Sequence, residues 1–498
     1  MNAKSLLANL LLAGLLSVVY LPCAAGDDNP PPEMSPDVKM LGELKDSKGW
    51  FKADPSYEGE KYDGPAQLAI YDGKHLNKTA KPLQLGIRLY DRGAYTPRPT
   101  VIGEKNPINF HFMSYGDLRI AGAYYDNGVP AANGKTEQST IAARLNLDMD
   151  FAFTATERIH AFVRPLDKNG SFTRYQISGG VKNKFIDEFD FKLDTLFFEG
   201  DVNAIREGLT GKQTFSDLPV AFGRVPLFTQ NGIWLDDAFD GVAFGITARN
   251  NPKHDISNMD FTFFAGFDKV TTAAAPGDNA KMFGVAGFAD ARKGYVEYGY
   301  GYVRADNDDL SYHNVTAAFS RRYRVAGVGL ANSVRLIGNI GQKGAPTKTA
   351  DGLLVLLENS FFRHDPIFFV PYINFFAGFN RPQPLARAAD TGGVLKNSGI
   401  NFESDGLTGY PTLDARAQDS WGAAGGLEKL WGIDQQIVVE AAVVQRMRSN
   451  TLGNQYAIGV RYQHPLSNAW IFRADAMRGW RQKQNDVYGV RVELRRKF

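Results

Sequence analysis

Charged side chains recur at every second position in several segments of this chain. Near the C-terminus, Arg491 and Glu493 would share one face of an extended strand, while the apolar residues between and beside them would share the other. A row of guanidinium groups lowers the energy barrier for anions and hydroxyl-rich solutes, whereas arginines paired with carboxylates only stabilise the wall that carries them. Both interpretations stay open. The arginines that share a face with polar neighbours are Arg144, Arg158, Arg164, Arg335, Arg446, Arg461, Arg473 and Arg491.

The sequence gives little sign of catalysis. Its seven histidines occur without an HExxH or GxSxG pattern, so neither a metalloprotease nor a serine hydrolase is predicted. The acidic stretch Asp306–Leu310 lacks the spaced oxygen ligands of a tuned calcium site and is expected to be a solvated loop. A formal net charge of only +2 argues against nucleic acid as a partner. We therefore expect no enzyme activity, no catalytic residues, no metal site and no cofactor.

Residues 1–25 have the layout of a cleavable secretory signal. A positive charge at Lys4 precedes the apolar stretch Leu6–Leu21, and small residues follow it. Cleavage near Ala25 would remove this segment together with the only cysteine of the chain. Residues 26–110 begin with a proline-rich stretch and show no continuous apolar pattern. We expect them to form a short periplasmic extension that partly enters the structure formed by the rest of the chain.

From residue 111 onward, apolar and polar side chains alternate in segments of about ten residues that are separated by Gly, Asn, Asp and Pro clusters. Ser139–Phe153 and Gln455–Gln463 show this period of two clearly, and in Glu188–Phe197 the pattern predicts that Phe197 faces lipid. Mean hydropathy is −0.28, and no apolar run after the signal approaches the roughly 20 residues of a spanning helix. A transmembrane β-barrel is the class of protein that these features predict.

A soluble β-sandwich or a propeller is the alternative fold. The polar face of each segment is as strongly charged as the opposite face is apolar, and aromatic residues gather at segment ends, as they do at membrane interfaces. No repeat occurs at the spacing of propeller blades. We therefore expect an all-β fold in which residues 111–498 form a transmembrane antiparallel barrel of about eighteen strands, with sixteen or twenty also possible.

The longest gap between predicted strands is Asn380–Asp419. Counting back from a C-terminus in the periplasm places this segment on the outer side of the membrane. Long connections without secondary structure are usually functional or disordered. The segment is expected either to fold back over or into the lumen and narrow it, or to be an ordinary mobile surface loop.

The last predicted strand resembles the C-terminal strand of Gram-negative outer-membrane barrels, which commonly ends on a phenylalanine that the barrel-assembly machinery reads. Arg496 departs from that pattern, which prefers an apolar or aromatic residue at this position. An arginine near the membrane interface can extend its guanidinium group to water. The residues that carry the resemblance, and that we predict to be an assembly signal, are Tyr488, Val490, Val492, Leu494 and Phe498.

The segment Leu218–Ile246 is similar to large diffusion porins of the alginate-export and phosphate-selective types. A strand that runs into Gly223–Arg224, then a loop and the acidic pair Asp236–Asp237, carries this likeness. Those families use lumenal arginines to pass anionic sugars or phosphate. The resemblance therefore adds Arg224 to the candidate selectivity residues.

Together these patterns predict a porin, an outer-membrane channel for the diffusion of small hydrophilic solutes that are anionic or sugar-like. The partners expected are outer-membrane lipid, the barrel-assembly machinery and the solutes, while the oligomeric state stays open. The alternative is a barrel that transports nothing and acts as an adhesin or as a scaffold around a partner protein.

Deleting Phe498 is expected to reduce insertion into the outer membrane sharply, because the terminal aromatic residue completes the predicted assembly signal. The measurement is the amount of heat-resistant barrel in outer-membrane fractions of cells that express the full chain or the truncated one. A truncated chain that reaches the membrane at the level of the full chain and resists heat equally would contradict the prediction.

Overall fold

The computed structural model describes residues 83–86 by their backbone and residues 110–498 in full apart from several short gaps. The predicted signal peptide and nearly all of the predicted extension lie outside the described residues. The gaps are residues 131–133, 155, 178–182, 215, 275–279, 326, 345–347, 363–368, 389–391, 404–405, 432–434, 449–450 and 468.

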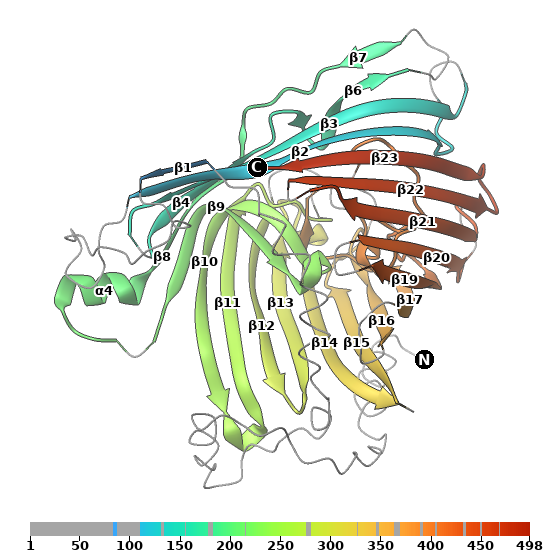
Figure 1. Cartoon of the computed structure of the whole chain (residues 1–498). Coiled ribbons are helices and arrows are strands. Elements are labelled where there is room, and N and C mark those ends of the chain that lie inside the picture. The colour runs from blue at the N-terminus through green and yellow to red at the C-terminus, as the bar shows by residue number, and fades with distance from the viewer. Residues whose placement is uncertain are drawn as a thin grey trace.

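Among the described residues, eighteen antiparallel strands form a closed barrel (Figure 1), which confirms the predicted fold class and strand number. Strand β2 closes the ring by pairing with β23, and Phe498 extends this contact by exchanging two backbone hydrogen bonds with Gly116. A closed ring leaves no strand edge with unpaired backbone groups in lipid. In order around the wall the strands are β2 (His111–Asp126), β3 (Glu137–Ala152), β4 (Arg158–Val163), β8 (Leu193–Asp201), β9 (Pro219–Thr229), β10 (Leu235–Asn251), β11 (Ile256–Asp268), β12 (Lys281–Ala291), β13 (Gly294–Arg304), β14 (Tyr312–Val325), β15 (Val328–Ile340), β16 (Asp351–Phe362), β17 (Phe369–Arg381), β19 (Ser420–Trp431), β20 (Gln435–Arg446), β21 (Gln455–Pro465), β22 (Trp470–Arg481) and β23 (Val487–Lys497).

Shorter elements lie beside the barrel wall or within the barrel. The helix α4 follows β8, and the Asp201 side chain caps it by accepting a hydrogen bond from the backbone N–H of Ala204 at 2.8 Å. Within the part of the chain that the structure describes, no helix is both long and apolar enough to cross a membrane. The shorter elements are β1 (Leu83–Gly86), β5 (Asp167–Lys168), β6 (Ser171–Gln176), β7 (Lys184–Ile186), α4 (Val202–Thr210), β18 (Ala386–Arg387) and the 3-10 turns η1 (Gln230–Gly232), η2 (Pro252–His254), η3 (Asp308–Leu310) and η5 (Lys396–Ser398).

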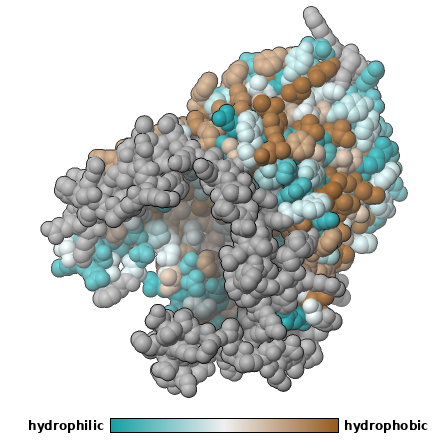
Figure 2. All heavy atoms as spheres, viewed as in Figure 1, coloured by the Kyte–Doolittle hydropathy of each residue, from teal (hydrophilic) through white to brown (hydrophobic). Residues whose placement is uncertain are grey.

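The alternation of the sequence separates the two faces of the wall. Ile458 on β21 and Val490 on β23 lie on the outer face, with 49% and 54% of their surface exposed, whereas Ala457 is buried on the inner face. Hydrophobic residues gather on the outer face of the C-terminal strands at the upper right of Figure 2. An apolar outer row is what a strand needs in order to contact lipid.

One face assignment made from the sequence is wrong. The strand β8 begins only at Leu193, and Leu196 and Phe198 lie on its outer face. Phe197 therefore faces inward, where its ring stacks on that of His160 with 4.8 Å between the ring centroids. Residues 187–192 are not part of a strand. The alternation that the sequence shows across them therefore does not indicate which residues of β8 face outward.

Two segments fold into the barrel from the rim opposite the C-terminus, which we call the loop rim. One is the tip of the β9–β10 hairpin, where Trp234 donates its indole N–H to the side-chain oxygen of Asn314 on β14 at 2.7 Å. The other is the described part of residues 382–419, the inner loop, in which Leu385 donates its backbone N–H to the Trp234 carbonyl at 2.8 Å. Leu385 and Phe402 are buried in the apolar core inside the barrel. The prediction that this long segment folds into the lumen is confirmed, and the surface-loop alternative is wrong.

Val460→Arg is expected to destabilise the barrel by about 2–4 kcal/mol, because Val460 lies on the outer face beside the exposed Val439 of β20, within the apolar band. Gln463→Arg, on the inner face of the same strand, is the matched control and should cost far less. Unfolding free energies of the refolded proteins in lipid vesicles provide the measurement. Equal losses at both positions would show that the two faces do not divide lipid from water.

Candidate functional site

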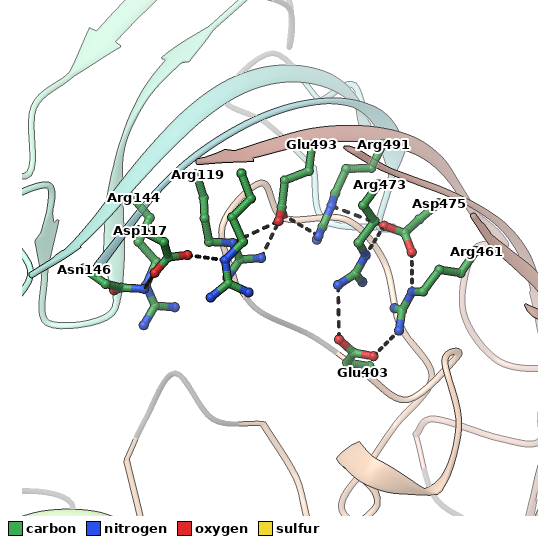
Figure 3. Close-up of polar contacts among 11 residues, drawn as sticks. Asp117, Arg119, Arg144, Asn146, Glu403, Arg461, Arg473, Asp475, Arg491 and Glu493 are labelled. Carbon is green, nitrogen blue, oxygen red and sulfur yellow. Dashed lines mark hydrogen bonds and ion pairs between the residues drawn. The ribbon is translucent and has the colours of Figure 1, made fainter. Parts of the chain in front are cut away.

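One side of the barrel interior carries arginines from neighbouring strands, β21, β22, β23, β2 and β3 (Figure 3). Regular pairing of β22 with the strands on either side sets Asp475 directly between Arg461 and Arg491. These side chains point inward because they occupy the face opposite the exposed apolar row. We call this group the arginine row; it consists of Arg119, Arg144, Arg461, Arg473, Arg491 and Arg495.

Asp475 connects three members of the arginine row. Its carboxylate accepts a hydrogen bond from Nε of Arg461 at 2.7 Å and another from Nε of Arg473 at 2.9 Å. Nε of Arg491 lies 3.5 Å from the same carboxylate. The Asp475 side chain is only 5% exposed. Charge-assisted contacts of this kind are short and strong, so Asp475 fixes the positions of all three guanidinium groups.

Glu493 continues the network toward β2. It accepts a hydrogen bond from Arg491 at 2.9 Å and binds Arg119 with both oxygens, at 2.8 and 3.0 Å. Beyond it, Arg495 forms an ion pair with Asp117 of β2. The carboxylates thus alternate with the arginines along the wall, which offsets the repulsion between neighbouring cations.

Arg144 extends the arginine row onto β3. It donates its Nε–H to the amide oxygen of Asn146 at 2.9 Å, and its guanidinium lies over the ring of Phe172, 5.4 Å from the centroid. Across the row, four carboxylates contact arginines: Asp117, Glu403, Asp475 and Glu493.

The fourth carboxylate comes from the inner loop. Oε2 of Glu403 contacts Nη1 of Arg461, and Oε1 lies 3.5 Å from Nη1 of Arg473. Burial raises the pKa of the Glu403 carboxyl, but the charges of Arg461 and Arg473 outweigh that effect and hold the pKa below its ordinary value. Glu403 is therefore ionised at neutral pH.

The loop backbone beside Glu403 is held by a separate set of contacts. Glu440 on β20 accepts the backbone N–H groups of Ile400 and Asn401, each at 2.9 Å. The ring of Phe402 packs edge-on against Phe376 of β17, with the centroids 5.8 Å apart. The position of the loop at this point does not depend on the Glu403 side chain.

The wall opposite the arginine row carries hydroxyl groups beside charged residues. Ser320 of β14 donates to Ser333 of β15 at 2.9 Å, and Ser333 shares the inner face with Arg335. These strands line a cavity of about 850 Å³ inside the barrel, to which Ser320 and Ser333 contribute together with the charged Glu297 and Glu358. The hydroxyl groups can bind polar solutes by donating and accepting hydrogen bonds.

Other predicted arginines lie inside the barrel but away from the arginine row. Arg158 on β4 binds Glu199 at 2.7 Å near the rim that carries the C-terminus. Arg335 on β15 donates to Gln230 of the hairpin tip at 2.6 Å and to Glu297 at 2.9 Å. Arg335 therefore helps to hold the β9–β10 hairpin inside the barrel.

Two further predicted arginines hold turns and loops. Arg164 follows the last residue of β4 and binds Asp194 at 3.0 Å, where the chain leaves the wall. Arg446 at the end of β20 binds Asp414 of the inner loop at 2.6 Å. Burial raises the pKa of the Asp414 carboxyl, but the contacts with Arg416 and Arg446 outweigh that effect and keep the pKa below its ordinary value.

The expectation that Arg224 faces the lumen is wrong. In the register of β9 with β10, Phe222 lies opposite Val242, and both side chains are exposed on the outer face. Arg224 lies opposite Asp240, two residues further along each strand. Residues two apart share a face, so Arg224 also lies on the outer face. There it binds Asp240 through two hydrogen bonds of 2.8 and 3.1 Å. The assignment came from a family resemblance, whereas the apolar Phe222 and Phe228, which share its parity, indicate the outer face.

Three functional candidates were not predicted. Arg119 and Arg495 both occupy the charged parity of their strands, so the period of two was sufficient to find them. Glu403 carries no such signal. It lies in a segment without periodicity, and it meets Arg461 only because the inner loop returns into the barrel. No local pattern in the sequence could have found it.

No known protein family profile matches this chain, and no curated protein is significantly similar to it in sequence. Solved structures are similar in fold. OpdK of Pseudomonas aeruginosa, solved with vanillate, matches 77% of this chain and 98% of its own at a TM-score of 0.50 and 10% identity. OccAB4 of Acinetobacter baumannii matches the same shares at a TM-score of 0.51 and 9% identity. OccAB2 of the same species matches equally at 0.50 and 10%.

These neighbours are outer-membrane channels with an 18-strand barrel. At this level of identity the likeness concerns the fold of the chain. The neighbours do not support the resemblance to alginate-export and phosphate-selective porins, and the outward position of Arg224 removes the residue that was carried over from it.

Acid is expected to loosen the inner loop. Asp414 has a lowered pKa, so its contacts with Arg416 and Arg446 are complete at neutral pH and are lost only as the pH falls through that lowered value, below the ordinary carboxyl pKa of about 4. Single-channel currents that are steady at pH 7 should therefore begin to fluctuate as the pH is lowered through the acid range. Asp414→Asn should fluctuate already at pH 7, whereas Asp486→Asn, at an exposed pair with Arg478, should not. Steady currents from wild type throughout the acid range and from Asp414→Asn at pH 7 would refute this account.

Proposed function

We propose that the protein is an outer-membrane uptake channel for small hydrophilic anions, in particular carboxylates that also carry hydroxyl groups. The observation that carries the proposal is the arginine row, six guanidinium groups that extend across neighbouring strands inside the barrel. Guanidinium groups bind carboxylates in a planar two-bond geometry and stay charged at any physiological pH. The row would offer a permeating anion a series of equivalent contacts.

A series of similar sites suits transport better than one strong site. A solute must bind well enough to enter and weakly enough to leave. Five arginines of the row contact Asp475, Glu493 or Asp117, which limits how tightly any one of these five holds a solute. The solute can then exchange between neighbouring arginines instead of remaining at one.

The opposite wall supports the second half of the proposed solute class, the hydroxyl groups. Ser320 and Ser333 face the same interior and can donate to or accept from hydroxyl groups of a solute. A sugar acid would meet both walls with matching chemistry, the carboxylate on the arginine side and the hydroxyls on the other. The fold neighbours are outer-membrane channels, and OpdK was solved with vanillate, which is compatible with this function.

The proposal also includes the orientation of the barrel in the outer membrane. The loop rim would face the outside and the C-terminal rim the periplasm, since the barrel ends on the predicted assembly signal at Phe498. Outer-membrane lipid would surround the apolar outer face, and the barrel-assembly machinery would insert the chain. The predicted signal peptide would direct its export.

Planar-bilayer recordings of the refolded barrel test the function. We expect a channel that prefers chloride to potassium in a salt gradient and whose current is blocked by gluconate but far less by glucose. Arg473→Gln should weaken gluconate block about tenfold or more, because a hydrogen bond to a charged group contributes about 1.5–3 kcal/mol. Arg158→Gln, an interior arginine outside the row, is the matched control and should leave the block unchanged.

Absence of any current from correctly folded protein would remove the channel proposal and favour the non-transporting scaffold. A cation-selective current that gluconate does not block would retain a channel but refute the anion class. If Arg473→Gln and Arg158→Gln weaken gluconate block equally, the arginine row does not bind the solute more strongly than other interior arginines do.

A further inference from the structure

The carboxylate of Glu403 lies where the proposed function would place the carboxylate of a solute. We propose that Glu403 is an internal occupant of a carboxylate-binding site formed by Arg461 and Arg473, and that a solute carboxylate exchanges with it during passage. This inference rests on the proposed function and adds a specificity-determining residue to it.

The first argument is the geometry of the two arginines. Arg461 and Arg473 each use Nε to bind Asp475, which belongs to the wall. Each also directs Nη1 toward one oxygen of Glu403, which comes from the loop (Figure 3). The pair thus binds one carboxylate on its wall side and a second on its lumen side. The lumen-side position accepts any carboxylate that can span both guanidinium groups.

The second argument is the difference between the two carboxylates. The Asp475 side chain is 5% exposed, whereas that of Glu403 is 30% exposed. The contact from Glu403 to Arg473 is also long, at 3.5 Å, whereas Asp475 lies 2.9 Å from the same guanidinium. Glu403 is therefore the more accessible of the two, and it contacts two arginines where Asp475 contacts three, so it is the one that a solute can replace.

The third argument is that the exchange needs no movement of the loop. The backbone at Ile400 and Asn401 is bound by Glu440, and Phe402 is buried against Phe376. Only the side chain of Glu403 has to rotate away from the arginines. It has three rotatable bonds before the carboxylate, and it can return as soon as the solute leaves.

The exchange keeps the charge of the site constant. Arg461 and Arg473 contact a lumen-side carboxylate both before and after the exchange, so the end states avoid the energetic cost of two desolvated guanidinium groups without that partner. A returning Glu403 would also help to release the solute, because it competes for the same donors. Chloride cannot span the two guanidinium groups with paired oxygens, so the site would favour carboxylates over halide ions.

Glu403→Gln is the decisive variant, with gluconate as the probe and the full barrel in a planar bilayer. Removing the internal competitor should strengthen gluconate block about tenfold, because wild type offers the site to a solute only in the fraction of time that Glu403 is displaced. The residence time of each blocking event should lengthen by a similar factor. Glu403→Asp keeps the charge but is shorter, and it should give an intermediate strengthening.

Glu428→Gln is the matched control, because it removes one negative charge from the inner face of β19, two strands away from Arg461. A general electrostatic effect would strengthen gluconate block equally in Glu403→Gln and Glu428→Gln, and that outcome would overturn the inference. Unchanged or weaker block in Glu403→Gln would overturn it as well. In both cases, block of wild type by gluconate would leave the proposed function intact. If gluconate does not block wild type, the proposed function fails and the inference fails with it.

Discussion

The interior of this barrel depends on carboxylates placed between arginines. Six guanidinium groups on neighbouring strands would repel one another, and Asp475 and Glu493 make their proximity possible by bonding to several of them at once. Buried ion pairs of this kind recover their desolvation cost only when the geometry satisfies most donors and acceptors. The regular strand register provides that geometry, because it sets charged residues of opposite sign level with each other.

The two sides of the barrel interior perform different tasks. Strands β10–β16 contribute large apolar side chains such as Phe239, Ile337 and Leu354 to a packed core with the hairpin tip and the inner loop. Strands β21–β3 keep a charged surface that faces the remaining space. Apolar packing thus narrows the lumen from one side, and in the proposed function the charges of the other side would decide which solutes pass.

Much of this architecture could be predicted from the period of two alone, because lipid on one side and water on the other impose opposite demands on successive residues. That rule places Arg461, Arg473 and Arg491 correctly. It failed at Phe197, where the strand begins later than the pattern suggests, and it was overridden at Arg224 by a family likeness. Glu403 could not be found, since its contact depends on the path of a loop that has no repeating pattern.

The division between wall and loop explains why the carboxylate that we propose to exchange belongs to the loop. A strand carboxylate such as Asp475 is held by its register between several arginines, and its replacement would leave the wall with unbalanced charge. A loop side chain can be positioned by backbone contacts elsewhere, here at Glu440, so its own carboxylate is not needed to hold the loop. Rigid strands set where the guanidinium groups lie, and in the proposed exchange the loop would set how strongly a solute must compete for them.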